Sequence, residues 1–372
     1  MDDLVFDPSS HTHRRYNPLI DEYVLVSPHR NKRPWLGQTE PPQQVVLPEF
    51  DPACYLCPGN KRAGGQSNPR YTKTFVFEND FSALPSSPIP TAPSVDHPLL
   101  RAEPIHGSCD VVVFHPRHDV TLARMSLDGL LNVVEEWKRV YEYRSSKPGI
   151  KYVQIFENKG SMMGCSNPHP HSQVWSLSEI PSIAEKELRA LTKYSLSEIA
   201  HSDSPRPPNG NPCLLCEYAH FEANTENGPR VVAKTNHWIA LVPWWAVWPF
   251  EVLLLPYRRH ICSISELTPE ETACFAQILS EVTVRYDNLF SCSFAYSMGI
   301  HQSPISSKAS GDIDTSIAHL HVHLLPPLLR SASVRKFLVG FELMAEPQRD
   351  LTPEQGAARL RECSSTHYLS SI

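Results

Sequence analysis

Two short histidine runs stand out because their spacing could gather several imidazole rings at one site. Polar residues alternate in both 169–173 (H-P-H-S-Q) and 319–323 (H-L-H-V-H). Alternate side chains of a β-strand share one face, so each run predicts a polar face with neighbours about 7 Å apart. One such run would most simply be a solvated face, but two runs at matching places favour a site. The alternating residues are His169, His171 and Gln173 in the first run, and His319, His321 and His323 in the second.

The chemistry that these runs could perform is transfer at phosphorus. A neutral imidazole can attack the α-phosphorus of a nucleotide sugar and displace a sugar phosphate. The covalent product keeps positive charge on the ring and therefore stays reactive towards a second phosphate. The loop at 158–167 is rich in small and hydrogen-bonding residues that could contact phosphate oxygens, although such loops are often only turns. We expect His171 to be the nucleophile.

The elements that must position these runs occur twice along the chain. Each half contains, in order, a C-x-x-C pair, a strand ending at a histidine, a helix, a strand and a histidine run. Matched landmarks in one order predict an α+β fold that is built twice. In the first half these are Cys54 and Cys57, 110–118, a helix capped by Ser126, 152–156 and 169–175. In the second half they are Cys213 and Cys216, 251–260, a helix opened by the capping box Thr268–Glu271, 293–296 and 319–325.

Length and composition limit the other possibilities. The 372 residues suffice for two domains or one duplicated domain, and we place the division at 1–195, a linker at 196–212, and 213–372. The net charge of −6, without a dense basic run, argues against nucleic-acid and membrane-surface partners. Thirty-five prolines, many of them within 34–104, predict long ordered loops with few helices in that region.

The chain shows no export or membrane signal in its sequence. Its acidic first residues lack the apolar core of a signal peptide. The most apolar stretch, 238–256, contains three prolines and predicts strand, turn and strand rather than a membrane span. The ten cysteines include two C-x-x-C pairs, which favours metal ligation over disulfides. We therefore expect a cytoplasmic protein.

The run at 169–173 resembles the histidine-triad superfamily, and its H-x-H-x-Q form resembles the galactose-1-phosphate uridylyltransferase branch. Nearly the whole chain is similar, and the similar segments are 17–19, 27–35, 156–160, 296–299, 335–340 and 348–351. The resemblance implies antiparallel sheets forming a half-barrel with flanking helices. It also implies a ping-pong reaction, in which UDP-glucose gives its uridylyl group to His171 and galactose 1-phosphate then accepts it.

The same resemblance assigns substrate contacts to particular positions. Gln173 is expected to bind phosphoryl oxygens together with Gly164, Cys165 and Ser166. A glutamine can donate a hydrogen bond but cannot act as an acid, and a leaving sugar phosphate needs no proton, so Gln173 favours transfer over hydrolysis. The uridine or nucleotide contacts are expected to be Asn79, Asp80 and Asn158. The hexose contacts are expected to be Lys336, Phe337, Val339, Phe341, Glu342 and Gln348.

The resemblance also implies a homodimer, because Arg30 and Arg33 match residues that reach the nucleotide from the neighbouring subunit. Phe341 stands where the family commonly has tyrosine, which would remove one contact to a sugar hydroxyl. Ser172 stands where glycine is common in bacterial members, and it should face away from the two histidines.

Metal ligands follow from the same comparison. Thiolate and imidazole donors in the first half suit a tetrahedral structural zinc, and these are Cys54, Cys57, His118 and His169. A second site, holding iron or zinc, is implied at Glu187, His301, His321 and His323. The duplication raises one more possibility, which is a further zinc at Cys213, Cys216, His260 and His319. Bacterial members lack this C-x-x-C pair, and a pair of buried reduced cysteines is the alternative.

Two other functions remain open from the sequence. One is a related nucleotide-sugar phosphorylase or hydrolase, which an activity assay with ADP-glucose and inorganic phosphate would detect. The other is an inactive, zinc-stabilised binding protein, against which the intact His171, Gln173 and Ser166 argue. The segment from Lys336 to Gln348, which resembles the hexose site of the uridylyltransferases, argues against the first.

Overall fold

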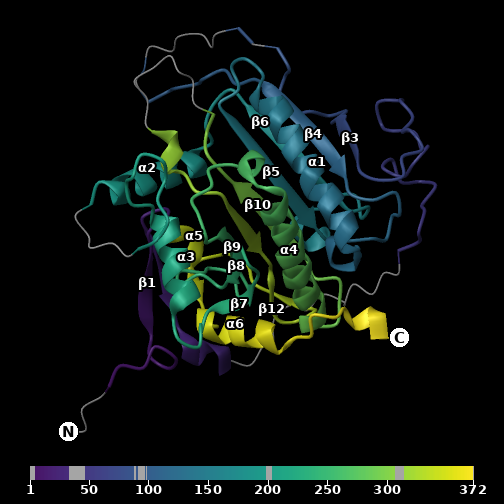
Figure 1. Cartoon of the computed structure of the whole chain (residues 1–372). Helices are drawn as coiled ribbons and strands as arrows, with labels where there is room; N and C mark the ends of the chain where they lie inside the picture. Colours follow the sequence, from purple (N-terminus) through teal and green to yellow (C-terminus); the bar gives the residue numbers. More distant parts are fainter. Residues whose placement is uncertain are drawn as a thin grey trace.

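The computed structural model describes residues 5–32, 47–87, 89–90, 97, 99–197, 203–305 and 314–371. It is an α+β protein built around one open, antiparallel sheet that runs through both halves of the chain (Figure 1). In spatial order its strands are β3 (Phe75–Glu78), β4 (Gly107–Val113), β6 (His171–Leu177), β5 (Tyr152–Lys159), β10 (Tyr296–His301), β11 (His321–Leu325), β9 (Val252–Pro256), β8 (Trp238–Leu241) and β7 (Val231–Lys234).

The strand order confirms the predicted duplication. The first half contributes β4, β6 and β5 in this order, and the second contributes β9, β11 and β10 in the matching order. The two triplets meet where β5 pairs antiparallel with β10, with Phe156 opposite Gly299. An approximate two-fold relation therefore passes between these central strands and relates one histidine run to the other.

Two long helices cover one face of the sheet, α1 (Leu127–Ser145) and α4 (Pro269–Leu289), and they pack against each other (Figure 1). Both begin as predicted. Ser126 accepts a hydrogen bond from the backbone N–H of Gly129, and Thr268 and Glu271 form a reciprocal capping box. One apolar face of α1 is buried in the core, and its members are Leu130, Val133, Val134, Trp137, Val140 and Tyr141.

In the second half the sheet is covered on its other face as well. Leu253 and Leu255 of β9 pack with α2 (Ser182–Ser195) and α3 (Leu214–Asn224), whereas Val252 and Leu254 face the core beneath α1 and α4. Burial on both faces explains why the residues of β9 are continuously apolar. The stretch 238–256 is strand, turn and strand, as predicted, and no described helix is long and apolar enough to cross a membrane.

Several predicted strand boundaries are wrong. The strands predicted to end at His118 and His260 end earlier, at Val113 and Pro256, because prolines in these segments cannot donate to a strand ladder. The histidine-run strands begin only at His171 and His321, and not at the first histidine of each run.

A third boundary is also wrong, because β10 begins where the predicted strand at 293–296 ends. The backbone N–H of Phe294 donates to the Asp287 carboxylate instead of to a neighbouring strand. In the described parts of 34–104, β3 is the single strand and the remainder is loop or turn, as its prolines predict.

Smaller elements tie the two ends of the chain together. A separate sheet contains β1 (His13–Asn17), β2 (Glu22–Val26) and β14 (Gln348–Arg349), and β2 pairs parallel with β14. The remaining C-terminal elements are β12 (Leu328–Ser331), β13 (Val334–Arg335), α5 (Phe341–Met344) and α6 (Pro353–Glu362).

A buried ion network anchors this N-terminal sheet. The Arg15 guanidinium is 1% exposed, and its two Nη atoms donate to the two carboxylate oxygens of Glu354 at 3.0 and 3.1 Å. Arg230 donates to the same carboxylate at 3.0 Å. Burial alone would raise the pKa of Glu354, but the hydrogen bonds and charge of Arg15 lower it to about 2. The carboxylate therefore links β1 to the first turn of α6.

We expect Glu354→Gln to lower the free energy of unfolding by about 1.5–3 kcal/mol, because two buried guanidinium groups lose a charged acceptor. Since the folded-state pKa lies below the ordinary value, this stabilisation is present at neutral pH and is lost as the pH falls from about 4.5 towards 2. Denaturant titrations over this range check both points. Glu362→Gln, at the exposed end of the same helix, is the matched control, and equal losses in both variants would contradict the assignment.

Candidate active site and metal centres

His171 is the first residue of β6, and its ring is held by the chain itself. Nδ1 lies 2.7 Å from the carbonyl oxygen of His169. A carbonyl oxygen can only accept, so Nδ1 carries the proton and Nε2 presents its lone pair. Burial lowers the pKa of His171, which keeps the ring neutral at neutral pH. The side chain therefore has the protonation state of a nucleophile.

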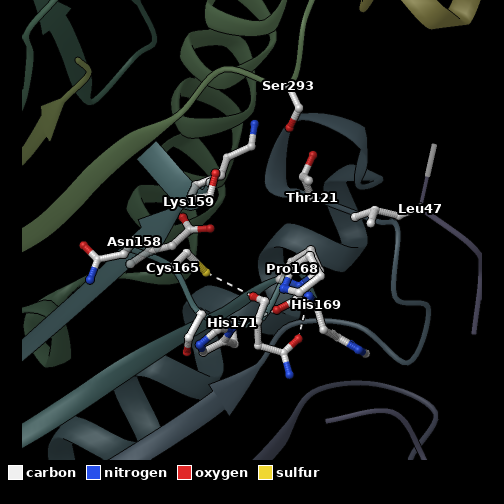
Figure 2. A pocket seen from close by; sticks show the side chains of 15 residues that line it. Leu47, Thr121, Asn158, Lys159, Cys165, Pro168, His169, His171 and Ser293 are labelled. Carbon is white, nitrogen blue, oxygen red and sulfur yellow. Dashed lines mark hydrogen bonds between the residues drawn. The ribbon is translucent and has the colours of Figure 1, made fainter. Parts of the chain in front are cut away.

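The ring opens onto a cavity of about 400 Å³ (Figure 2). A smaller recess of about 50 Å³ adjoins it and adds Phe156, Gly164 and Gln173 to the lining. The two spaces share four residues, Asn158, Cys165, Ser166 and His171. The structure thus gathers the predicted nucleophile and its predicted phosphate contacts around one hollow.

Two amide side chains in this hollow are oriented by neighbours. The Oε1 atom of Gln173 accepts from the indole N–H of Trp175 at 3.1 Å, and Oδ1 of Asn158 accepts from the Ser297 hydroxyl at 2.7 Å. With both oxygens engaged, the NH₂ groups are the ends that can donate to a ligand. The site therefore presents hydrogen-bond donors, which suits phosphoryl oxygens.

The loop before His171 is tightly turned. Gly164 has a φ of +77°, a conformation that side chains other than glycine rarely adopt. The backbone N–H groups of Gly164 and Cys165 donate to the carbonyl oxygens of Ser161 and Gly160. Donation from these two amides to a phosphate would require the turn to open, whereas the Ser166 residue lines both spaces without such a rearrangement.

The cavity is also lined by residues that the sequence did not single out as site residues, and the polar ones include Thr121, Glu157, Lys159 and Ser293. Burial raises the pKa of Glu157 to about 7, and its carboxyl accepts from the Tyr296 hydroxyl at 2.9 Å. Lys159 is paired with Asp287 at 2.8 Å. The sequence signal for Glu157 and Lys159 was their charge at alternate positions just after the predicted strand 152–156.

The first metal cluster brings together Cys54, Cys57, His118 and His169, whose potential ligand atoms lie within 4.8 Å of one another. All four residues are buried. The Nε2 atom of His169 donates to the carbonyl oxygen of His115 at 2.8 Å, which leaves Nδ1 facing the sulfurs at 3.4 and 3.8 Å. Burial lowers the pKa of His169 to about 4, so the ring is neutral and able to ligate. Two thiols and two imidazoles suit tetrahedral zinc.

The second cluster joins Glu187 of α2 to the histidines of β10 and β11. Nδ1 of His301 lies 2.8 Å from the Glu187 carboxylate, and Nε2 atoms of His321 and His323 lie 3.7 and 3.8 Å from it. Among the described residues, these two Nε2 atoms are buried without a hydrogen-bond partner. Burial alone would raise the pKa of Glu187, but His301 holds it well below its usual range. A metal ion bound by these four groups would satisfy the unpartnered nitrogens.

The expected hexose contacts gather in a separate pocket of about 200 Å³. Lys336 lines it and donates to the Glu342 carboxylate at 2.6 Å and to the Gln348 carbonyl oxygen. Arg30 lines the same pocket and pairs with Asp350 at 3.4 Å. The predicted residues that line it are Arg30, Lys336, Phe337, Val339, Glu342 and Gln348.

Three of the remaining predicted contacts, Asn79, Asp80 and Phe341, do not line the pockets described above. Asn79 and Asp80 follow β3 at the edge of the sheet, and Asp80 lies 3.7 Å from Arg62. Phe341 opens α5 and is 53% exposed. Arg33 falls outside the described residues. Ser172 faces α1, as expected, and accepts from the Trp137 indole at 2.9 Å.

The duplicated antiparallel fold, with a buried histidine held beside a Cys₂His₂ cluster, defines a histidine-triad-type enzyme. The family described as galactose-1-phosphate uridyl transferase, N-terminal domain, matches residues 5–181, and its C-terminal domain matches 187–372. The chain belongs to the galactose-1-phosphate uridylyltransferase family. A Rattus norvegicus member is 50% identical over 98% of this chain and 90% of its own, and a Cryptococcus neoformans member is 49% identical over 95% and 91%.

Solved structures agree on the architecture. A uridylyltransferase structure shares 26% identity with a TM-score of 0.69, covering 94% of this chain and 97% of that one. An ADP-glucose phosphorylase from Arabidopsis thaliana has a TM-score of 0.70 at 22% identity, covering 95% and 99%, which shows a common fold.

We expect Glu187→Ala to remove the metal of the second cluster, because its carboxylate contacts all three histidines. Elemental analysis should find about one metal ion fewer per chain. Glu185→Ala, on the exposed side of the same helix, is the matched control and should keep the full metal content. Unchanged metal in Glu187→Ala would refute the cluster as a metal site.

Proposed function

We propose that this protein transfers a uridylyl group from UDP-glucose to galactose 1-phosphate through a covalent intermediate on His171. The observation that carries the proposal is the His171 ring, whose Nδ1–H is held by the His169 carbonyl while Nε2 faces a cavity lined with donors. Family membership supports the substrates, because the relatives are named as galactose-1-phosphate uridylyltransferases.

In the first half-reaction, Nε2 of His171 attacks the α-phosphorus of UDP-glucose and the bond to glucose 1-phosphate breaks. The imidazole gains positive charge as the N–P bond forms, and the His169 carbonyl stabilises that charge through Nδ1–H. The Gln173 NH₂ group donates to a phosphoryl oxygen, where negative charge increases. The leaving sugar phosphate departs as an anion and takes no proton.

In the second half-reaction, a phosphate oxygen of galactose 1-phosphate attacks the same phosphorus. The N–P bond breaks, UDP-galactose forms, and the neutral ring of His171 returns. Each half-reaction uses the same donors, because the geometry at phosphorus is shared. No acid is needed in either direction, which agrees with glutamine at position 173.

A phosphorylase of the same fold is the alternative with a specific observation behind it, namely the similarity to the plant ADP-glucose phosphorylase. Its 22% identity is far below the 50% shared with the Rattus norvegicus uridylyltransferase. The built pocket around Lys336 and Gln348 also favours a hexose phosphate acceptor over inorganic phosphate.

The metals are assigned to structural roles. We assign zinc to the Cys₂His₂ cluster, and iron or zinc to the cluster of one carboxylate and three imidazoles. When bound, the zinc neutralises the two thiolates and fixes His169, whose carbonyl positions His171. The protein residues then perform every step described above.

The arrangement of the pockets supports a homodimer with shared sites. Arg30 and Lys336 lie in one pocket of the chain and His171 lies in another, although the family resemblance places their counterparts on one substrate. A two-fold dimer would bring the hexose pocket of one protomer to the His171 cavity of its partner. Each active site would then draw residues from both chains.

Labelled UDP-glucose should leave uridylyl label on the wild-type protein and none on His171→Ala. The reason is that the variant lacks the nitrogen that forms the N–P bond. Protein denatured at alkaline pH, where the N–P bond survives, is separated from substrate and its label is counted. His220→Ala, on α3, is the histidine control and should label like the wild type. Equal labelling of His171→Ala would reject His171 as the nucleophile.

Mixing two inactive variants tests the shared site. His171→Ala and Lys336→Ala should each be inactive alone, but mixed dimers should regain one intact site of two. After denaturation and random reassociation, activity should reach about a quarter of the wild-type value. If each site belonged to a single chain, every site of a mixed dimer would carry a lesion and no activity would return.

A further inference from the structure

We propose that the second half of the chain holds its own tetrahedral zinc, bound by Cys213, Cys216, His260 and His319. This site is distinct from the His171 cavity and from the two clusters assigned above. The proposal does not depend on the uridylyl transfer, because the argument concerns only the geometry and chemistry of these four residues.

The residues are close together and buried. The potential ligand atoms of Cys213, Cys216 and His260 lie within 4.8 Å of one another, and Nδ1 of His260 lies 3.4 Å from the Cys216 sulfur. The ring of His319 packs beside His260 with centroids 4.9 Å apart, compared with 5.1 Å for the two rings of the first cluster. The exposed fractions of the four are 0%, 1%, 8% and 0%.

Both rings are oriented as metal-ligating histidines are. Nε2 of His260 donates to the Ser316 carbonyl oxygen, and Nε2 of His319 donates to the Pro256 carbonyl oxygen, each at 2.9 Å. These bonds place the proton on Nε2 and the lone pair on Nδ1. Nδ1 of His319 accepts from the backbone N–H of Ile261 at 3.2 Å, and His319 lies outside the 4.8 Å group of the other three residues. Binding of zinc by His319 would replace this hydrogen bond.

The same arrangement of hydrogen bonds around a histidine occurs in the first half of the chain. There His169 donates from Nε2 to a carbonyl and turns Nδ1 to two cysteines, while its own carbonyl accepts from His171 at 2.7 Å. In the second half the carbonyl of His319 accepts from Nδ1 of His321, also at 2.7 Å. The duplicated fold has therefore kept the hydrogen bond from Nε2 of this histidine to a carbonyl oxygen and the link from its own carbonyl to the next histidine.

Zinc explains the burial better than free thiols or a redox pair. Thiol–disulfide exchange requires an accessible sulfur, and both sulfurs are at most 1% exposed. Two buried thiolates are costly alone, but a dication bound by two thiolates and two imidazoles forms a neutral unit. With four protein ligands, the ion is structural, and it joins the start of α3 to the segments before β11 and after β9.

Metal analysis of purified protein is the first test. Cys213→Ser plus Cys216→Ser should contain about one zinc fewer per chain than the wild type. The matched control is Cys274→Ser plus Cys292→Ser, two buried cysteines outside the three clusters, and it should keep its zinc. Equal zinc in all three proteins would overturn the proposal.

A second measurement guards against a variant that does not fold. In the Cys54→Ser plus Cys57→Ser background, the cobalt-substituted protein should still show thiolate-to-cobalt charge-transfer absorption, which His260→Gln should weaken or shift. A complete absence of that absorption would refute the site. The site would also be refuted if denatured, unreduced wild-type protein had two free thiols fewer than its ten cysteines, because a disulfide would then join Cys213 and Cys216.

Discussion

The hydrogen bond from Nδ1–H of His171 to the His169 carbonyl is the interaction on which the active site depends. It fixes the tautomer of the His171 ring, orients Nε2 towards the cavity, and can stabilise the ring when it carries positive charge. The His169 ring is in turn held between two cysteines and the His115 carbonyl. One residue therefore couples a structural cluster to the proposed nucleophile over a distance of two positions. Any change that loosens the cluster would misplace the attacking nitrogen, and small displacements of that kind are costly in catalysis.

The duplication shows how one scaffold supports two kinds of chemistry. The third position of the run is Gln173 in the first half and His323 in the second. An amide donates to phosphate, whereas an imidazole can ligate a metal. His323 and His321 face Glu187 from α2, so the second half has a cluster that could hold a metal ion where the first half keeps a cavity. Fold and strand order are shared, and a few side chains decide the role of each face.

The separation of the two pockets would give the proposed dimer a physical role. The donors around His171 are proposed to bind phosphoryl oxygens, while Lys336, Glu342 and Arg30 line a charged pocket elsewhere on the same chain. A site completed by a partner subunit would close around substrate from two sides. Such closure limits access by water, which would otherwise hydrolyse a reactive phosphoramidate.

By itself the sequence determined the repeated order of elements, the family, the cap residues of α1 and α4, and the residues of the first cluster, because spacing, caps and C-x-x-C pairs are local signals. It placed strand ends poorly, since these depend on prolines and on side chains such as Asp287 that compete for backbone N–H groups. It did not single out Glu157 or Lys159 as site residues, because their partners Tyr296 and Asp287 lie far along the chain. The family resemblance implied that Glu187 joins three histidines, and the tertiary structure brought these four residues together. Only the tertiary structure decided that the hexose residues gather apart from His171. Those outcomes depend on contacts between distant segments, which no local pattern encodes.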